Sequence, residues 1–394
     1  MQRLSIVERG DWRAQAAACG FDFHTIDGAP YWDETAYYAF TLRQIEDDIE
    51  DPSAELHAMA MDLVDEVVGS EELLSRLAIP EYTWNWIAES WRQRQPHLYG
   101  RLDLAYDGNG PAKLYELNYD TPTSLFEAAF FQWQWLEDQR QAGRLPEYAD
   151  QFNALHEALV ARFAEIAPRL PPPLMFASVH ASGEDRGTVE YLRDCAAQAG
   201  LQGEAIDIEE IGLSDDGRFT DLDDVVIGTL FKLYPLEDLF AESFGKALPG
   251  SGLQLLEPAW KAVLSNKGIL PLLWQRHQGH PNLLAAHFDE GGALPAGWVR
   301  KPLHSREGAN ITLHLPDGSL QESDGPYAGP CIRQAMHLLP AFAGRYPLIG
   351  SWVIGDAACG MGIREDEGRI TRDSARFVPH AILDAPPSQG VIYA

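Results

Sequence analysis

The sequence predicts an α/β fold of the α+β kind, in which a helical N-terminal region and a polar β-hairpin precede a small parallel sheet. Apolar residues recur with helical periodicity over residues 34–51 and 53–68. Two alternating runs flank the turn sequence Asp107-Gly108-Asn109-Gly110, which favours a hairpin. Strand-like and helix-like segments alternate over residues 174–228, which is typical of units with parallel strands.

The region before the hairpin, from residue 1 to about residue 95, is expected to be mainly helical. A third helix is predicted over residues 83–94, where three tryptophans recur at spacings more typical of a packed core than of cofactor contacts: Trp84, Trp86 and Trp91. After the hairpin, helices are predicted over residues 124–142 and 150–166.

Three prolines at residues 171–173 mark a predicted boundary. The expected parallel sheet follows, with strands at 174–179, 202–208 and 224–228 and a helix over 188–199. No GxGxxG or Walker sequence accompanies it, which argues against nucleotide-binding folds of those two types. The elements predicted further along are a helix start at 265–274, a strand ending at 302, a polar loop at 303–312, strands within 331–339 and 348–356, and a flexible small-residue segment at 357–364.

Composition limits the classes of function. The 394 residues are 45% hydrophobic, enough for a large core, and carry a formal net charge of −29. This charge opposes binding to nucleic acid, and no apolar run reaches membrane-spanning length. The charge is compatible with a cationic substrate such as a polyamine, although many proteins are acidic for solubility alone. Four widely spaced cysteines and an N-terminus without a signal-peptide core predict a cytoplasmic protein.

The hairpin presents polar side chains that suit a metal ion. A two-residue turn at 108–109 would place Arg101 opposite Glu116, with Asp103 diagonal to Glu116 at about 7–8 Å. Because side chains alternate along a strand, all three share a face with Asn118. Two carboxylates and an amide are oxygen ligands that Mg²⁺ takes, usually together with substrate phosphates. An ordinary exposed hairpin with a cross-strand ion pair is the alternative interpretation.

The segment after the hairpin is expected to begin a helix. Ser124 and Glu127 have the spacing of a capping box. Free N–H groups at a helix start favour anions, and Thr121, Thr123 and Ser124 add hydroxyl groups there. A substrate carboxylate or a transferred phosphate would fit beside the metal. The alternative is an ordinary capped helix.

With these residues and with motifs further along, the chain resembles the glutathionylspermidine synthetase family of ATP-grasp ligases. The resemblance runs from about residue 95 to the C-terminus and is weaker before it. Four motifs occur in the family's order. They are Arg101-x-Asp103 followed by Tyr115-Glu116-x-Asn118-x-Asp120, Asn266-Lys267 with Ile269-Leu270-Pro271, Val299-Arg300-Lys301-Pro302 leading to Arg306-x-Gly308-x-Asn310-Ile311, and Gly360-x-Gly362-Ile363-Arg364-x-Asp366-Glu367.

The resemblance implies an ATP-grasp fold of the glutathionylspermidine synthetase type and a single synthetase unit over residues 1–394. Its expected subdomains are approximately residues 1–170, the helical region with the metal and substrate hairpin at 101–120; residues 171–255, a small α/β subdomain; and residues 256–394, an ATP-binding subdomain.

The resemblance also implies roles for individual residues. Asp103, Glu116 and Asn118 match the Mg²⁺ ligands of the family, and Arg101 and Arg364 match arginines at the reaction centre. The ATP-binding positions are matched by Lys267, Lys301, Arg306, Gly308, Asn310 and Gln334. The positions that bind substrate are matched by Thr121 and Thr123 for the acid, and by Glu184 and Asp185 for the amine.

The chain departs from the family in three places. Cys19 and His24 show no motif of the Cys–His amidase found in bifunctional members, so they are assigned structural roles. Arg186 intrudes beside the acidic pair at 184–185, and Ser305 stands where the family tends to glycine. Ligation of an acid to an amine is therefore better supported than spermidine as the acceptor.

The predicted function is an ATP-dependent ligase that uses two Mg²⁺ ions. It would join the carboxylate of a glutathione-like peptide or other small acid to an amine through an acyl phosphate, and release ADP and phosphate. Its expected partners are small molecules, with no nucleic acid and no membrane. The alternatives are a peptide ligase with an amino-acid or diamine acceptor, and a catalytically silent nucleotide- or polyamine-binding protein.

Overall fold

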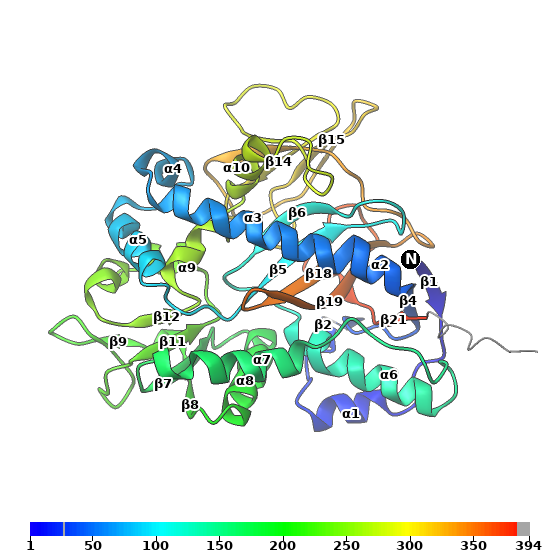
Figure 1. Ribbon diagram of the computed structural model, residues 1–394, viewed down its shortest axis with the longest axis horizontal. Coiled ribbons are helices and arrows are strands. Elements are labelled where there is room, and N and C mark those ends of the chain that lie inside the picture. Colours follow the sequence, from blue (N-terminus) through cyan, green and yellow to red (C-terminus); the bar gives the residue numbers. More distant parts are fainter. Residues whose placement is uncertain (27, 384–394) are drawn as a thin grey trace, which may run out of the picture.

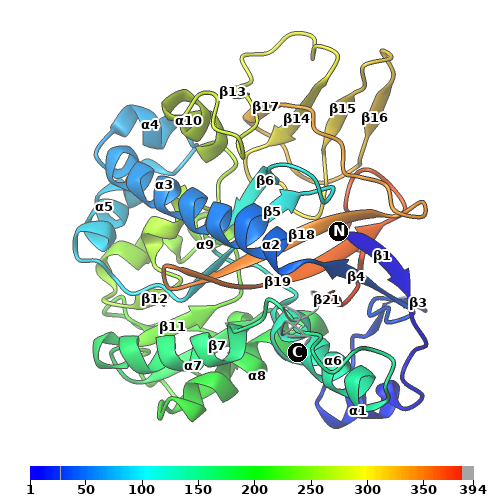
Figure 2. The same ribbon diagram turned by 45° about the vertical axis from the view of Figure 1, so that its right-hand side comes forward.

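Three sheets dominate the computed structural model, which describes residues 1–26 and 28–383 (Figure 1). A five-stranded sheet lies at the top, a second five-stranded sheet crosses the middle, and a four-stranded parallel sheet lies at the bottom (Figure 1 and Figure 2). The predicted mixed α/β fold is confirmed. In the part of the chain that the structure describes, no helix is long and apolar enough to cross a membrane.

The middle sheet carries the predicted hairpin at its edge. Its antiparallel strands are, in spatial order, β20 (Arg376–Phe377), β19 (Ala357–Asp366), β18 (Tyr346–Ile354), β5 (Tyr99–Ala105) and β6 (Lys113–Asn118). The prediction of a flexible segment at 357–364 is wrong, because these residues form most of β19. Gly360 and Gly362 let Leu155 and Phe377 pack directly on that strand.

The top sheet is antiparallel. Its strands are β13 (Ala286–Phe288), β17 (Cys331–Ala335), β14 (Trp298–Pro302), β15 (Thr312–His314) and β16 (Leu320–Glu322). Helix α10 (Ile269–Arg276) packs against β13. The predicted strand ending at 302 and the loop that follows it are confirmed by β14 and its connection to β15.

The predicted parallel sheet is confirmed, but one of its strands is misplaced. The strands are β12 (Gln254–Leu256), β11 (Thr229–Lys232), β7 (Leu174–Ser178) and β8 (Gly203–Asp207), covered by α7 (Leu155–Ile166) and α8 (Gly183–Gln198). The strand predicted at 224–228 is wrong. Asp224 has a φ of +61°, which breaks extended backbone, so the chain enters β11 only at Thr229.

The N-terminal region is less helical than predicted. Strands β1 (Gln2–Ser5), β4 (Ala36–Phe40) and β21 (His380–Ile382) form a small sheet, so the helix predicted over residues 34–51 is wrong before residue 42. Its second part is confirmed, because helical backbone begins at Leu42 and continues through the segment 46–50. All of β4 is buried, and its aromatic residues favour a central strand. The remaining elements are α1 (Trp12–Ala18), β2 (Thr25–Ile26), β3 (Ala29–Pro30), α2 (Leu42–Ile45), α3 (Asp51–Val68), α4 (Glu71–Arg76), α5 (Trp84–Arg92), α6 (Gln132–Gln141), β9 (Gly212–Leu213), β10 (Phe219–Thr220) and α9 (Leu236–Ala241).

The tryptophans of α5 pack against the main hydrophobic core, as predicted. The ring of Trp91 lies 5.1 Å from that of Trp260, edge to face. Helix α8 begins at Gly183, five residues before its predicted start, because Ser182 caps it by accepting a hydrogen bond from the backbone N–H of Asp185 at 3.2 Å.

A buried ion pair joins the hairpin to the parallel sheet. The Asp120 carboxylate accepts from Lys232 Nζ of β11 at 2.5 Å and from the backbone N–H of Leu236 at 2.7 Å. Both charged side chains are fully buried. Asp120, the last residue of the hairpin motif, therefore fixes two sheets relative to each other. The three-part division of the chain stays a prediction.

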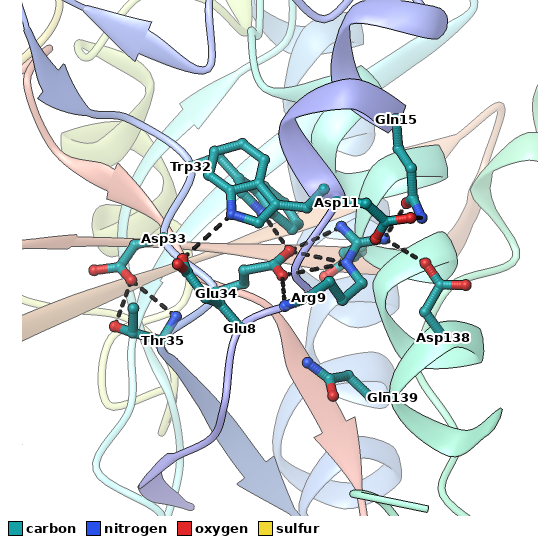
Figure 3. A network of polar contacts seen from close by, with 12 residues as sticks. Glu8, Arg9, Asp11, Gln15, Trp32, Asp33, Glu34, Thr35, Asp138 and Gln139 are labelled. Atoms are coloured by element: carbon teal, nitrogen blue, oxygen red, sulfur yellow. Dashed lines mark hydrogen bonds and ion pairs between the residues drawn. The ribbon is translucent and has the colours of Figure 1, made fainter. Parts of the chain in front are cut away.

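A second buried network, drawn in Figure 3, ties the N-terminal segment to α6. The guanidinium of Arg9 contacts both carboxylate oxygens of Glu34, at 2.8 Å for the Nη2–Oε2 pair, and Arg9 Nη1 lies 2.8 Å from Asp138 Oδ2. Trp32 Nε1 donates to Glu34 at 2.9 Å. The network holds residues 31–34 in place beside α6.

Loss of the Glu34 charge should destabilise the fold strongly. Glu34→Gln leaves the nearly inaccessible Arg9 with a weaker partner, so the free energy of unfolding should fall by about 3–5 kcal/mol in urea titrations. The control Glu165→Ala removes a carboxylate whose side chain is 68% exposed and paired with Arg162, and should cost less than about 1 kcal/mol. Equal losses in the two variants would contradict a structural role for the network.

Candidate active site

A β-bulge and the length of the connecting loop set the register of the hairpin. The ladder shifts between Asp103 and Leu104, so Asp103 lies directly opposite Glu116 and Arg101 lies opposite Asn118. The predicted register, with Arg101 opposite Glu116, is wrong by two residues. A shift of two preserves the face on which side chains lie, and cross-strand partners share a face. The four polar side chains therefore still point to one side of the sheet.

Asp103 is the centre of this polar cluster, although only 1% of it is exposed. Its Oδ1 lies 2.8 Å from Arg101 Nε, and its Oδ2 accepts from Asn118 Nδ2 at 3.1 Å and from Arg364 Nη2 at 3.0 Å. Gly350 of β18 makes room for this arrangement, since a Cβ there would lie 2.8 Å from Arg101 Cδ. The structure thus brings Arg364, from β19, to the hairpin.

Two lysines face Glu116. Its Oε2 lies 3.1 Å from Lys267 Nζ, which also donates to the carbonyl of Ser305. Burial alone would raise the pKa of Glu116, but the ammonium groups of Lys267 and Lys301 outweigh it and lower that pKa to about 2. Lys301 Nζ donates to Gln334 Oε1 at 2.7 Å and to the Tyr115 carbonyl at 3.1 Å. Burial lowers the pKa of Lys301 to about 8.

A cavity extends from these lysines between the top and middle sheets. Val299 and Leu313 form an apolar wall from the top sheet, and Leu348 lines the opposite side from β18. Gln334 places an amide among these apolar groups, and its Nε2 donates to the Leu114 carbonyl at 3.2 Å. The cavity therefore has a charged part at Asp103, Glu116 and the two lysines, and an apolar part at Val299, Leu313 and Leu348.

The predicted ATP-binding residues of the loop at 303–312 divide between this cavity and its surroundings. Gly308 lines the cavity with a φ of +67°, where a Cβ would lie 2.6 Å from Ile370. Asn310 supports the loop, because its Oδ1 accepts from the backbone N–H of Tyr327 at 2.7 Å. Arg306 points instead to Thr121, a predicted substrate-binding residue, and donates to its Oγ1 at 2.7 Å and to Glu237 at 2.7 Å.

The helix start after the hairpin differs from the prediction. The capping box of Ser124 and Glu127 is wrong: the Tyr31 hydroxyl donates to Glu127 at 2.5 Å and lies 2.9 Å from Ser124 Oγ. Glu127 begins a π-helical turn, Glu127–Phe131, that leads into α6. Thr123 contacts Arg101 through its backbone carbonyl, which accepts from Nη1 at 2.7 Å.

Several carboxyl groups gather beside Arg364. Burial raises the pKa of Glu127 to about 7. Burial, followed by repulsion from Glu127, Asp185 and Asp373, raises the pKa of Glu184 to about 8. The acidic pair predicted at 184–185 therefore lies within electrostatic range of the arginines at the hairpin.

Sequence reasoning missed Tyr31, Glu127, Glu237 and Asp373 as members of this region. The signal available for Glu127 was that it is the sole charged residue in the apolar run 125–131. Its capping-box spacing concealed that signal. Tyr31 lies far from the motifs in sequence, whereas Asp373 follows the last motif by six residues, and neither had such a signal.

The hairpin suits a hard divalent cation. In the described part of the chain, no group of three or more His, Cys, Asp or Glu side chains is arranged to hold a metal. The hairpin offers two facing carboxylates and one amide, so substrate phosphates would have to complete the coordination shell, as is usual for Mg²⁺. Arg101, Arg364 and Lys267 neutralise those carboxylates in the structure.

The fold and this arrangement place the chain in the ATP-grasp class. A solved glutathione synthetase-like effector from Globodera pallida has the same fold, with a TM-score of 0.56 over 95% of this chain and 96% of that chain at 10% identity. Residues 3–383 match the family model described as glutathionylspermidine synthase preATP-grasp, so the chain belongs to that family.

Two relatives illustrate the family. A Haemophilus influenzae protein described as a "putative acid–amine ligase" is 40% identical over 388 residues, which cover 94% of this chain and 97% of that protein. Trypanothione synthetase of Crithidia fasciculata is 29% identical over 347 residues, 80% of this chain but 52% of that enzyme. The chain thus spans about half the length of the trypanothione synthetase.

The Glu127 carboxyl should make the fold less stable as the pH rises. Its pKa is raised above the ordinary 4.5 to about 7, so it takes up a proton on folding and stability falls between these pH values. Thermal denaturation would measure the decrease in melting temperature from pH 5 to pH 7. This decrease should be smaller in Glu127→Gln than in the wild type. The exposed control Glu147→Gln should keep the wild-type slope. Parallel curves for all three proteins would refute the assignment.

Proposed function

We propose that the protein is an ATP- and Mg²⁺-dependent ligase that joins a small carboxylic acid to an amine. One observation carries the proposal: Asp103 and Glu116 face Lys267 and Lys301 at the charged end of an apolar cavity. The membership of the glutathionylspermidine synthase family supports it. The four free cysteines fit a reducing compartment, and we place the protein in the cytoplasm.

The cavity between the sheets would hold ATP. The apolar walls at Val299, Leu313 and Leu348 suit an adenine ring, and the Gln334 amide can hydrogen-bond its edge. Lys267 and Lys301 lie where a triphosphate would emerge towards the hairpin. Gly308 lines the same cavity from the loop, close enough for backbone contact with phosphate.

Asp103, Glu116 and Asn118 would hold Mg²⁺ together with the phosphate oxygens. Two ions held there would neutralise the charge that develops on the transferred phosphoryl group. Arg101 and Arg364 would release Asp103 to the metal and bind the carboxylate of the acid. Both guanidinium groups now lie within 3.0 Å of Asp103, so a modest rearrangement brings them to a substrate oxygen.

The reaction follows from this placement. A carboxylate oxygen of the acid attacks the γ-phosphorus, the bond to the β-phosphate oxygen breaks, and ADP and an acyl phosphate form. The neutral amine then attacks the acyl carbon, phosphate leaves with the C–O bond electrons, and the amine gives up one proton. The positive groups at the hairpin stabilise the transferred charge throughout.

The two substrates would meet beside the start of α8. Thr121 and Thr123 lie next to Arg306 and Arg101, which suits the acid, for which a glutathione-like peptide is the model. Glu184 and Asp185 would attract a protonated amine. Burial raises the pKa of both carboxyls, and repulsion from Asp373 adds to it, so a cation beside them would favour their charged forms.

Turnover would test the proposal. The protein is incubated with ATP, Mg²⁺ and a panel of acids and amines, and ADP release is measured. We expect release that needs an acid, an amine and the metal together. Glu116→Gln should lower kcat on the order of 10²–10³-fold, because a charge that holds the phosphate-bound metal is lost.

The control Glu147→Gln changes an exposed carboxylate and should leave kcat unchanged. ATP binding without ADP release, for every acid and amine offered, would instead identify a silent nucleotide-binding protein. Full activity of Glu116→Gln would remove Glu116 from the metal site.

A further inference from the structure

A large cavity lies against one face of α8. It measures about 900 Å³, within the range of small-molecule sites. Its walls come from residues 19–23 after α1, residues 126–133 at the start of α6, the start of α7 and one face of α8. Figure 2 shows these helices together at the lower end of the molecule. None of the predicted site residues lines it.

One wall of the cavity is aromatic. The ring of Phe126 lies 5.5 Å from that of Phe130 and 5.6 Å from that of Tyr191, and Phe130 lies 6.2 Å from Trp133. Trp133 is 49% exposed. Such a row of rings leaves apolar surface in contact with water, which a ligand with a hydrocarbon body would cover.

The charged side chains that line the cavity are mostly acidic. Four carboxylates line it, namely Asp22, Glu157, Glu190 and Asp194, against one arginine, Arg186. Glu190 is paired with Arg193, and Asp194 accepts from Gln198. In the described part of the chain, the side chains of Asp22 and Glu157 make no hydrogen bond or ion pair. Two carboxylates beside the aromatic wall therefore have no ion-pair partner, and Arg186 can offset the charge of one of them at most.

Aromatic faces and unpaired carboxylates together select an organic cation. An ammonium group gains from the negative face of a ring and from a nearby carboxylate, whereas an anion is repelled by both. The formal net charge of −29 adds attraction for cations at long range. A neutral apolar compound would fit the wall but leave the acids unpaired.

The cavity adjoins the proposed amine site. Gly183 and Arg186 line it from the first turn of α8, the turn that also carries Glu184 and Asp185. Phe126 lines it, and the next residue, Glu127, points to Tyr31. Phe23 packs directly on Gly187, where a Cβ would lie 2.6 Å from its ring. The Arg9 network of Figure 3 fixes the α1 segment against α6 without a ligand.

We propose that this cavity binds an organic ammonium compound with a hydrocarbon body, as the part of the amine acceptor remote from the reacting nitrogen. The second half of this statement rests on the proposed function. Glu184 and Asp185 then receive the reacting end, and Trp133 with Asp22 and Glu157 receive the other end.

Calorimetry without nucleotide tests the cavity itself. The probes are octane-1,8-diamine, the neutral octane-1,8-diol and the anionic octanedioate, which share one hydrocarbon body. The diamine should bind at least tenfold more tightly than the diol, and the dioate should not bind. Trp133→Ala and the double variant Asp22→Asn/Glu157→Gln should each weaken diamine binding about tenfold.

Matched controls lie outside the cavity. Tyr148→Ala removes an aromatic ring that is 47% exposed, and Glu165→Gln removes a carboxylate of α7. Both should leave diamine binding unchanged. Equal binding of diol and diamine, or full binding by the cavity variants, overturns the proposal. Diamine binding lost only in Glu184→Gln/Asp185→Asn also overturns it, because the reaction centre alone would then hold the cation.

The outcomes separate this proposal from the proposed function. If the cavity variants weaken diamine binding but no acid and amine pair releases ADP, the ammonium site is supported and the ligase function is contradicted. If ADP is released, the cavity variants should raise KM for a long diamine about tenfold with kcat nearly unchanged. An unchanged KM would overturn the assignment to the acceptor.

Discussion

Asp103 and Glu116 face each other across β5 and β6, where like charges repel. Cations from separate parts of the chain offset that repulsion: Arg101 from β5, Arg364 from β19 and Lys267 from the segment before α10. Each cation comes from a different element. The ion pairs at the hairpin therefore connect strands of the middle sheet with the segment before α10, which packs against the top sheet. Mg²⁺ would offset the same two carboxylates, and the arginines and the lysine would then be free to pair with phosphate and carboxylate oxygens, so the side chains would exchange partners when substrates bind.

The chemistry of the hairpin was predictable because it lies in short motifs. Alternation along a strand puts Arg101 and Asp103 on one face. The same alternation puts Glu116 and Asn118 on one face of the neighbouring strand. The register was not predictable, since one residue of the shift comes from a bulge and the other from a connection longer than the predicted two-residue turn, and no residue in 101–118 announces either. The shared face survived because the observed register differs from the predicted one by two residues at Arg101, whereas a shift of one would have reversed the face.

Elsewhere, tertiary contacts overrode local signals. Ser124 and Glu127 have capping-box spacing, yet a tyrosine ninety residues or more away in sequence takes both side chains. The small residues of 357–364 suggested flexibility, but Gly360 and Gly362 are there so that other side chains can pack on β19. In each case the partner comes from a distant segment, and a single sequence contains no measure of that proximity.

Helix α8 relates the two regions of negative charge. Its first turn carries Glu184, whose pKa is raised by burial and by its acidic neighbours, and the face that follows lines the aromatic cavity. Glu184 and Asp185 lie on this turn, and Asp22 and Glu157 line the cavity beside it. Their mutual repulsion costs free energy while no cation is bound. A compound with two separated ammonium groups would relieve both regions at once, and a monoamine would relieve only one. Charge separation along the amine is therefore the property by which this structure would distinguish acceptors.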